Sequence, residues 1–539
     1  MSEQATNLAR HIVRRLVELG ISDVVISPGS RNAPLSLAFS DASKRGLIET
    51  HIRIDERGAA FYALGLAKAT NRYVPVVSTS GTAVANFMPA LLEAYHSNLR
   101  LLLLTADRPE RVRKTGSNQT TLQQGIFGNF VVKSIDTATA FEPSHLLADS
   151  QSNGGPVHFN LQFDEPLLPD ASNSTDSWLD GIKVTPLETK TLISGEIAIY
   201  QERTVVIIGH DLAGFTAEEV EAFALATKGV VLAEDPLSFP QCIPHASLIL
   251  SDEKVRADLQ ADLAIVIGRT TLNRSLNSYI SAAKRIMVID PRAAAIDTRR
   301  SADEIHHHLP KVVATKAEQQ WRERWLAFFS KAAEAISSSV EWSEGRVAAA
   351  VAQIDMDALF VASSRPIRDI EAFALPRDDA RIPVFANRGL AGIDGNISTA
   401  MGIAHHFNRS VALLGDLAFL HDISALTNLE DSDLTIIVVD NNGGGIFSTL
   451  PQRGVEHFES VFGTPHEKEL KKVATSFGVP AVEVDSIEGL LHAYEATGKK
   501  RGSSMRVIIA KMPDRESNAK NLDEIRERFS HLASGLMSR

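Results

Sequence analysis

The fold of this chain is decided by two stretches, Val411-Ala-Leu-Leu-Gly-Asp416 and Leu434-Thr-Ile-Ile-Val-Val-Asp-Asn-Asn-Gly-Gly-Gly445. Each is an apolar run of strand length that ends in polar residues or glycines, as a buried parallel strand does. Asp416 and Asn441 offer a carboxylate and an amide oxygen, while the glycines allow close backbone approach. Such hard oxygen ligands suit a Mg²⁺ that keeps its other positions for phosphate oxygens and water. The two stretches therefore predict a site for a metal-bound diphosphate.

Two ordinary strand-to-helix turns are the alternative interpretation, because Asp, Asn and glycine are common there as caps and turn formers. Short motifs produce many false matches, so either stretch alone favours that alternative. Ligand sites in open parallel sheets lie at the carboxyl ends of strands, and both Asp416 and Asn441 directly follow an apolar run. Their joint occurrence in a chain with an α/β plan favours the ligand site.

The bulk composition is that of a globular protein. The 539 residues suffice for three or four domains, with 44% hydrophobic and 22% charged residues. The net charge of −11 argues against a nucleic-acid partner. The single cysteine, Cys242, excludes an internal disulfide framework and favours a reducing, cytoplasmic location. We expect no transmembrane segment and no signal peptide, and the spacing of Leu8, Ile12, Leu16 and Leu19 predicts an amphipathic N-terminal helix.

Apolar runs alternate with helix-patterned segments along the whole chain, which predicts an α/β fold of three consecutive domains, each with a mostly parallel central sheet flanked by helices. We expect the domains to span residues 1–180, 181–345 and 346–539, with a polar linker at 170–177 and a helical connector at 316–349. The Gly209 to Gly214 turn lacks dinucleotide-binding spacing. Helices are predicted at 58–69 and 83–96, and strands at 24–26, 48–54, 74–77, 101–104, 157–159, 205–208, 229–232, 263–267, 286–289, 384–386, 411–414, 434–439 and 507–509.

A second candidate lies in the stretch from His51 to Gly58, where a strand runs into a helix. Glu56 would sit near the helix N-terminus, where a solvated or capping acid is the ordinary role. A carboxyl group buried in an apolar cleft can instead exchange a proton with a bound ring. Glu56 fits that role, and Asp55 is the alternative.

Five arginines are expected in loops beside strand or helix ends, where a cluster could bind acidic substrates: Arg31, Arg108, Arg274, Arg368 and Arg388. A solvated surface arginine is the ordinary reading of any one of them.

Several motifs together resemble the 2-succinyl-5-enolpyruvyl-6-hydroxy-3-cyclohexene-1-carboxylate (SEPHCHC) synthase family of thiamine diphosphate-dependent enzymes. They follow the family's order, and they cover the first and last thirds of the chain densely. The middle third is similar mainly in layout. The motifs are Ser27-Pro-Gly-Ser-Arg-Asn-Ala-Pro34, Ile54-Asp-Glu-Arg-Gly58, Thr79-Ser-Gly-Thr-Ala-Val-Ala-Asn86, Thr105-Ala-Asp-Arg-Pro109, Asn118-Gln119, Asn387-Arg-Gly-Leu-Ala-Gly-Ile-Asp-Gly395, Gly415-Asp-Leu417 and Asn441-Asn-Gly-Gly-Gly-Ile-Phe447.

The resemblance implies a pyrimidine-binding N-terminal domain, a central Rossmann-like domain and a C-terminal diphosphate-binding domain. It also implies a homo-oligomer, dimer or tetramer, with active sites between subunits. Mg²⁺, for which Mn²⁺ can substitute, would be bound by Asp416, Asn441 and the carbonyl of Gly443. Glu56 would be catalytic and Ile393 would support the bent cofactor. The implied cofactor-binding set is Pro28, Glu56, Gly389, Ile393, Gly415, Asp416, Leu417, Asn441, Gly443 and Ile446.

The activity implied by the resemblance is a transferase reaction of menaquinone biosynthesis. It decarboxylates 2-oxoglutarate and adds the succinyl carbanion to isochorismate by 1,4-addition, giving SEPHCHC and CO₂. Guanidinium groups would grip the substrate carboxylates. Asn273 stands where some members of the family carry lysine. The matching substrate positions are Ser30, Arg31, Arg108, Gln119, Arg274, Ser364, Arg368 and Arg388, with Phe447 and Leu450 on the apolar side.

Two other functions stay open at this point: another thiamine diphosphate-dependent 2-oxoacid decarboxylase or carboligase, and a non-catalytic relative that keeps the fold. His306, His307 and His308 are adjacent, so on a strand they cannot all face one metal ion, and we expect a polar loop or surface turn there.

Overall fold

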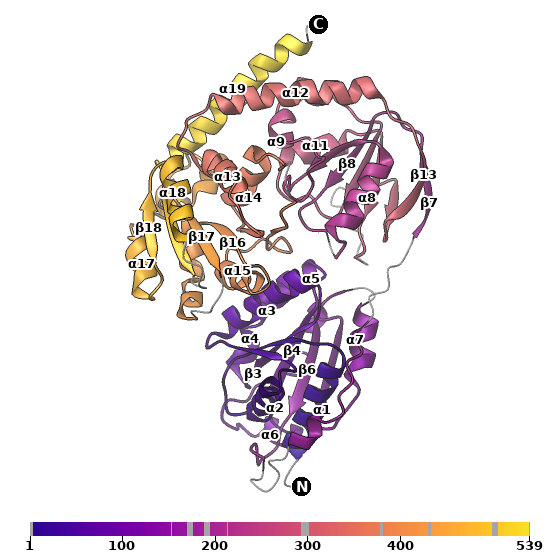
Figure 1. Cartoon of the computed structure of the whole chain (residues 1–539), viewed down its shortest axis with the longest axis vertical. Helices are drawn as coiled ribbons and strands as arrows, with labels where there is room; N and C mark the ends of the chain where they lie inside the picture. Colours follow the sequence, from indigo (N-terminus) through magenta and orange to yellow (C-terminus); the bar gives the residue numbers. More distant parts are fainter. Residues whose placement is uncertain are drawn as a thin grey trace. The chain divides into compact units, whose positions relative to one another are not determined.

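The structure, a computed structural model, describes residues 4–151, 154–169, 176–187, 194–212, 214–292, 301–377, 381–428, 433–498 and 505–537 (Figure 1). The chain forms two compact units. Unit 1 comprises Met1–Thr191, Asp394–His406 and Asp422–Asn428, and unit 2 comprises Leu192–Ile393, Phe407–His421 and Leu429–Arg539. No helix in the described part of the chain is both long and apolar enough to cross a membrane.

Unit 1 is built on a six-stranded parallel sheet in the order β2-β1-β3-β4-β6-β5. Its central strands are buried on both faces and are almost entirely apolar, as expected for a parallel sheet covered by helices. The strands are β1 (Asp23–Ile26), β2 (Glu49–Ile52), β3 (Val74–Ser78), β4 (Leu101–Asp107), β5 (Lys133–Thr137) and β6 (Val157–Gln162).

One helix of unit 1 comes from the last third of the chain. α15 (Asn396–Ala404) crosses α3 (Glu56–Thr70), and both helices are buried along nearly their whole length. A Cβ at Gly65 would lie 2.2 Å from the carbonyl oxygen of Thr399, and one at Gly402 would lie 2.2 Å from that of Tyr62. The crossing therefore depends on glycine in both helices. The other helices of unit 1 are α1 (Gln4–Glu18), α2 (Ala33–Lys44), α4 (Thr82–Ala85), α5 (Met88–His96), α6 (Glu110–Arg113) and α7 (Pro143–Gln151), with short turns η1 (Gly128–Phe130), η3 (Asp176–Leu179) and η4 (Ile423–Thr427).

Unit 2 contains a five-stranded parallel sheet, β12-β11-β10-β8-β9, and a two-stranded parallel ribbon of β7 and β13. The strands are β7 (Ser194–Ile199), β8 (Thr204–Ile208), β9 (Val230–Ala233), β10 (Leu263–Ile267), β11 (Arg285–Ile289), β12 (Glu304–His306) and β13 (Pro310–Thr315). The helices of this part are α8 (Ala217–Thr227), α9 (Ala246–Ile249), α10 (Glu253–Asp258), α11 (Arg274–Ser281) and α12 (Gln319–Ser337).

A second six-stranded parallel sheet in unit 2 has the order β15-β14-β16-β17-β19-β18. Gly415 of β16 pairs with Val439 of β17, so these two strands end at the same edge. The strands are β14 (Ala358–Val361), β15 (Val384–Phe385), β16 (Ser410–Gly415), β17 (Leu434–Asp440), β18 (Ala481–Val484) and β19 (Arg506–Lys511). The helices are α13 (Glu344–Ala352), α14 (Arg365–Phe373), α16 (Asp416–His421), α17 (Leu470–Ser476), α18 (Ile487–Gly498) and α19 (Arg515–Met537), with short helical turns η5 (Gly445–Thr449) and η6 (Glu459–Gly463).

The predicted α/β class, the N-terminal helix and all the predicted strands are confirmed. The single helix predicted over 83–96 is wrong: α4 and α5 are separate, because Pro89 is accommodated only in the first turn of a new helix. The predicted connector at 316–349 contains α12 and the start of α13. Most of the predicted linker, 170–175, lies outside the described residues.

We expect Gly402→Ala to destabilise unit 1, because the new methyl group overlaps the backbone of α3. Overpacking of this kind costs about 1–3 kcal/mol. Gly535→Ala in α19 is the matched control, since nothing lies within 4 Å of its Cβ position and alanine favours a helix. Thermal unfolding followed by calorimetry measures both, and an unchanged melting temperature for Gly402→Ala would show that the crossing tolerates a side chain.

Candidate active site

A pocket lies in unit 2 at the carboxyl ends of β16 and β17, beside the first turns of α13 and α14. Ligand sites of open parallel sheets form at this edge. The pocket brings together several of the residues predicted for cofactor or substrate, namely Ser364, Ile393, Gly415, Asp416, Leu417, Asn441, Gly443, Ile446 and Phe447.

Asp416 is the first residue of α16 and is 2% exposed. Its Oδ1 accepts a hydrogen bond from the Leu417 backbone N–H at 2.6 Å, and its Oδ2 accepts one from the Gly443 N–H at 2.8 Å. Nε2 of His466 lies 3.2 Å from the same Oδ2. The loop after β17 is thus fixed directly to the carboxylate that follows β16.

Asn441 is held through the nitrogen of its side-chain amide, and the oxygen is left without a partner in the described part of the chain. Its Nδ2 donates to Oε1 of Glu344 at 2.8 Å, and its buried Oδ1 has no hydrogen-bond partner among the described residues. A buried amide oxygen without a partner is costly, so it indicates a position at which a ligand binds. Burial, reinforced by the Asp369 carboxylate, raises the pKa of the Glu344 carboxyl to about 7.

Gly443 has a conformation that suits only glycine, with φ of 137°. A Cβ there would lie 2.0 Å from the Gly463 carbonyl oxygen, so the two loops touch through their backbones. The Gly443 carbonyl accepts a bond from the Gly445 N–H at 2.9 Å, which leaves one lone pair of that oxygen for another partner. Gly415 also lines the pocket, with open space where its Cβ would be.

These donors fit a hydrated Mg²⁺ and a diphosphate. A buried carboxylate, an amide oxygen without a partner and a backbone carbonyl are the oxygen ligands that Mg²⁺ prefers, and glycines leave room for phosphate oxygens. Ser364, at the start of α14, has φ of 82°, a conformation that is unfavourable for a residue with a side chain. Strain of this kind gathers at ligand sites.

In unit 1, Glu56 opens α3 and is half-buried. Asp55, the alternative, is already engaged: its Oδ1 caps α3 by accepting from the Arg57 and Gly58 N–H groups, and its Oδ2 accepts from Ser424 Oγ at 2.7 Å. Nδ2 of Asn86 lies 3.5 Å from Oε2 of Glu56. Glu56 is therefore the more available of the two carboxylates. Pro28 lies in the loop after β1 and is exposed.

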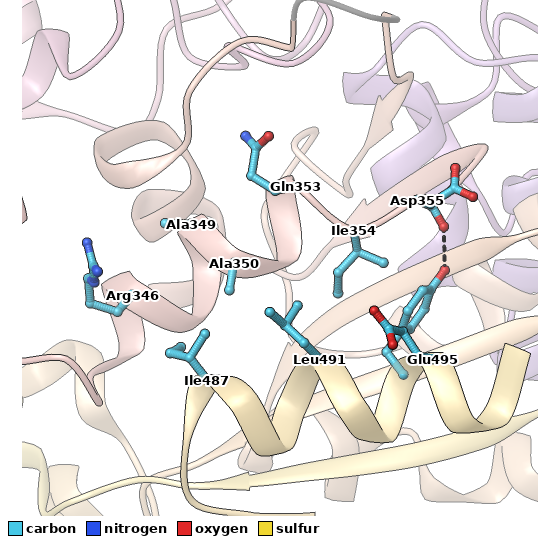
Figure 2. A pocket seen from close by; sticks show the side chains of 10 residues that line it. Arg346, Ala349, Ala350, Gln353, Ile354, Asp355, Ile487, Leu491 and Glu495 are labelled. Carbon is cyan, nitrogen blue, oxygen red and sulfur yellow. Dashed lines mark hydrogen bonds between the residues drawn. The ribbon is translucent and has the colours of Figure 1, made fainter.

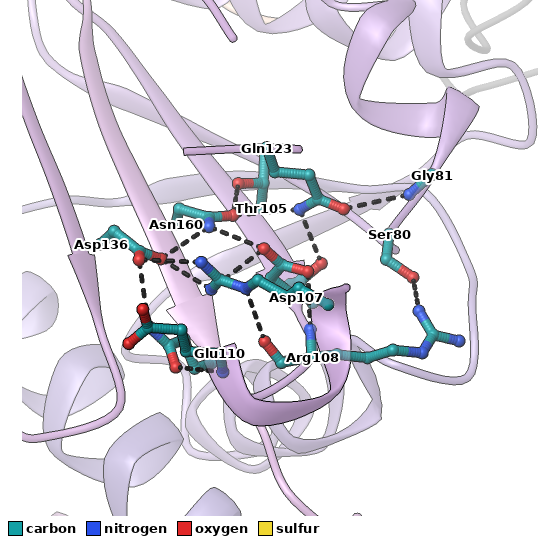
Figure 3. A network of polar contacts seen from close by, with 12 residues as sticks. Ser80, Gly81, Thr105, Asp107, Arg108, Glu110, Gln123, Asp136 and Asn160 are labelled. Carbon is teal, nitrogen blue, oxygen red and sulfur yellow. Dashed lines mark hydrogen bonds and ion pairs between the residues drawn. The ribbon is translucent and has the colours of Figure 1, made fainter. Parts of the chain in front are cut away.

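Arg108 directly follows β4 and is held by a polar network (Figure 3). Its guanidinium donates to Ser80 Oγ and to the Gln119 carbonyl oxygen, each at 2.7 Å. Arg31 is near Arg108, so two guanidinium groups lie in one region of unit 1. Burial and the charge of Arg31 lower the pKa of Arg108. Arg31 itself donates to the Phe163 carbonyl at 3.1 Å. Gln119 and Ser30 are exposed.

Arg368 and Arg388 form a second cationic region, in unit 2. Burial and the neighbouring Arg388 lower the pKa of Arg368 to about 10. Arg388 is 3% exposed, and its guanidinium donates to Thr271 Oγ1 at 2.7 Å. The prediction that Arg368 lies in a loop is wrong: Pro366 favours the first turn of a helix, so α14 already includes Arg368.

The remaining predicted residues lie outside the pocket lining. The prediction that Arg274 lies in a loop is also wrong, because Arg274 is the exposed first residue of α11. Asn273 caps that helix by accepting from the Ser275 N–H at 2.8 Å. Gly389 is buried and its carbonyl accepts from Arg269 at 2.6 Å. Leu450 ends η5.

Two groups of potential metal ligands occur among the described residues. Asp416, Asp440 and His466 form one, beside the pocket. Asp23, Glu49, His51 and His405 form the other, in unit 1, where hydrogen bonds of 3.1 Å between His51 and Asp23 and of 3.2 Å between His405 and Glu49 account for the arrangement. His306, His307 and His308 belong to neither group. The predicted polar loop begins only after His306, because His306 ends β12, where it contacts Glu304 at 2.6 Å.

Another hollow, of about 600 Å³, lies between α13 and α18 (Figure 2). It is lined by apolar residues such as Ile354, Ile487 and Leu491, together with Arg346 and Glu495. None of the predicted site residues lines this hollow.

Sequence reasoning missed Glu344 and His466. Glu344 follows the helix cap Ser343, so its sequence signal was only that of a helix start. His466 has no motif around it and reaches Asp416 through a loop that is remote in sequence.

Comparison with known proteins covers most of the chain. Residues 6–127 match the thiamine pyrophosphate enzyme N-terminal TPP binding domain, residues 172–361 the middle domain of thiamine pyrophosphate enzymes, and residues 379–507 the C-terminal TPP binding domain.

Three similar proteins bear the name 2-succinyl-5-enolpyruvyl-6-hydroxy-3-cyclohexene-1-carboxylate synthase. A Nocardioides protein is 36% identical over 97% of both chains, a Lysinibacillus sphaericus protein 33% over 93% of this chain and 95% of its own, and a Thermobifida fusca protein 36% over 89% and 92%.

Proposed function

The chain belongs to the SEPHCHC synthase family of thiamine diphosphate-dependent enzymes, and from this premise we propose that it decarboxylates 2-oxoglutarate and transfers the succinyl group to isochorismate. The products are SEPHCHC and CO₂, in menaquinone biosynthesis. The observation that carries the proposal is the buried pocket in which Asn441 Oδ1 lacks a partner beside Asp416.

We propose that Mg²⁺ is bound by Asp416, Asn441 and the Gly443 carbonyl, with Mn²⁺ able to substitute. The diphosphate would lie along Gly415, Leu417 and Ile446, and Ile393 would support the thiazolium ring. The pyrimidine end would contact Pro28, Glu56 and Gly389. When bound, thiamine diphosphate supplies the electron sink for decarboxylation and carbon–carbon bond formation.

Glu56 would hold a proton on one carboxyl oxygen and share it with the aminopyrimidine ring, because a carboxyl group can both donate and accept there. Asp55 is less suited, since both of its oxygens already accept hydrogen bonds.

Both substrates carry two carboxylates, and guanidinium groups can bind carboxylates in a bidentate manner. In unit 1 the proposed partners are Arg31 and Arg108, with Ser30 and Gln119 beside them. In unit 2 they are Ser364, Arg274, Arg368 and Arg388. Phe447 and Leu450 would cover the apolar part of the substrate.

We further propose a cytoplasmic homo-oligomer in which residues 1–180 bind the pyrimidine, residues 181–345 form the central domain and residues 346–539 bind the diphosphate. The family resemblance supports active sites between subunits. The N-terminal domain of one subunit would bind the pyrimidine end of the cofactor, and the C-terminal domain of another would bind the diphosphate end.

The test of the activity is to incubate the protein with thiamine diphosphate, Mg²⁺, 2-oxoglutarate and isochorismate, and to identify the adduct by mass spectrometry. Parallel reactions replace 2-oxoglutarate with pyruvate. We expect the adduct only with 2-oxoglutarate; preferential turnover of pyruvate would instead assign the chain to another carboligase activity.

Glu56→Gln should lower kcat for adduct formation by about 10²- to 10⁴-fold, the range contributed by a positioned acid–base group. Glutamine keeps the size of the side chain but cannot exchange a proton. Glu49→Gln, an exposed acid on β2, is the control and should retain full turnover. Equal activity of the Glu56 variant and the wild-type protein would exclude the proposed role.

Asp416→Ala should weaken Mg²⁺ binding by more than the 10- to 100-fold typical of losing an outer-shell partner, because a direct ligand is removed. Isothermal titration calorimetry with thiamine diphosphate and Mg²⁺ measures the change. Asp433→Ala, just before β17 and therefore at the other end of the sheet, should bind as the wild type does. Undiminished binding by Asp416→Ala would contradict the ligand assignment.

A further inference from the structure

Glu344 is a buried carboxylate whose hydrogen bond goes to Asn441, one of the proposed metal ligands. It is the first residue of α13, where Ser343 caps the helix by accepting from the Arg346 N–H. At 2% exposure, its side chain is withdrawn from water and lines the pocket at the carboxyl ends of β16 and β17. Burying a carboxylate is unfavourable unless it is paired or hydrogen-bonded.

The contact between Glu344 and Asn441 fixes one orientation of an amide. A carboxamide has two ends of nearly equal size, so packing alone does not decide which end faces a ligand. Glu344 Oε1 accepts from Asn441 Nδ2 at 2.8 Å. The flipped amide would set its oxygen against the carboxylate oxygen, which is repulsive. Glu344 therefore leaves Asn441 Oδ1 as the end available to a cation.

The second oxygen of Glu344 has no hydrogen-bond partner among the described residues and forms a long ion pair with α14. Glu344 Oε2 lies 3.9 Å from Nε of Arg365, and Arg365 is hydrogen-bonded to Asp369 one turn further along the helix. Asp369, Arg365 and Glu344 thus form a chain of charged groups that ends at Asn441. Each of the three is at least nine-tenths buried, so the chain restricts where the Glu344 carboxylate can lie.

The charge around the pocket also calls for a cation. Glu344, Asp369 and Asp416 bring three carboxyl groups to its lining, and Arg365 is the only lysine or arginine among the described lining residues. Like charges in a dry region repel strongly. A divalent cation near Asn441 Oδ1 would offset this excess of negative charge. It would also be bound by the amide oxygen in the orientation that Glu344 imposes.

We propose that Glu344 is a positioning residue that holds the Asn441 carboxamide with Oδ1 directed at the Mg²⁺ of the cofactor site. The proposal rests on the function proposed above, and it assigns to Glu344 an effect on metal affinity that is transmitted through Asn441.

The experiment compares Mg²⁺ affinity, measured by calorimetry at saturating thiamine diphosphate, for the wild-type protein and two variants. Glu344→Met keeps the volume but removes the acceptor, and it should weaken Mg²⁺ binding about 10- to 100-fold, as losses of outer-shell partners do. Glu344→Gln keeps an acceptor oxygen and loses only the charge, so it should weaken Mg²⁺ binding much less than Glu344→Met does. Circular dichroism checks that each variant is folded.

A double-mutant cycle separates positioning from general destabilisation. In an Asn441→Ala background, Glu344→Met should weaken Mg²⁺ binding no more than Glu344→Gln does in the wild type, because the amide is gone and only the loss of charge remains. Fully additive losses would overturn the proposal. Glu371→Met is the matched control: Glu371 is also a buried carboxyl in unit 2, but it accepts from the Ser247 N–H and does not line the pocket. It should lower the melting temperature and leave Mg²⁺ affinity unchanged.

Should Glu344→Met fail to fold, Asn441→Asp provides the same test from the other partner. Aspartate keeps an oxygen ligand but sets a second carboxylate against Glu344, so binding should weaken and should recover when Glu344→Gln is added. Absence of recovery would refute the positioning role. Failure of the wild-type protein to bind thiamine diphosphate and Mg²⁺ would refute the proposed function, whereas normal binding by every Glu344 variant would refute only this inference.

Discussion

The parallel pairing of β16 with β17 is the constraint on which the site depends. Because Gly415 lies opposite Val439, the chain leaves both strands at one edge of the sheet, and Asp416 reaches the Gly443 N–H across the gap between the two loops. A shift of one residue in either strand would turn every side chain to the other face and would separate these groups. The buried apolar residues of the two strands make such a shift unfavourable, so the core of the sheet fixes the geometry of the polar groups at its end.

Much of the fold was predictable because central parallel strands are apolar on both faces and stand out in the sequence. β5, β7, β12, β13, β14 and β18 were not predicted. Of these, β5, β12 and β18 lie at sheet edges and carry polar side chains, and β7 and β13 form the separate two-stranded ribbon. β14 is buried and apolar but only four residues long. Asp416 and Asn441 were predictable candidates because each follows a strand directly. Glu344 was not a predictable candidate, because its contact with Asn441 joins residues far apart in sequence and no local sequence pattern indicates that contact. The choice between Asp55 and Glu56 likewise depends on contacts in space, because Asp55 caps α3 and also accepts from Ser424, which is remote in sequence.

The two cationic regions differ in how they are supported. Arg108 is held by Ser80 and by the backbone of Gln119, so the turn after β3 and the loop that carries Gln119 must both be in place. Arg388 is almost fully buried and is supported by Thr271 from the five-stranded half of unit 2, which gives that part of the chain a role in shaping the site as well as in stability. A substitution at Thr271 or Ser80 would therefore remove a hydrogen bond that positions an arginine, while the arginine itself stays unchanged.

The glycine-dependent crossing of α3 and α15 has a consequence for biosynthesis. Unit 1 needs Asp394–His406 and Asp422–Asn428 in addition to its N-terminal segment, so it cannot be complete until more than three quarters of the chain has left the ribosome. Until then the apolar surface of α3 that α15 covers is exposed to water, and exposed apolar surface in nascent chains promotes aggregation. The protein should accordingly depend on chaperone protection during translation, more than a chain whose first domain closes on itself.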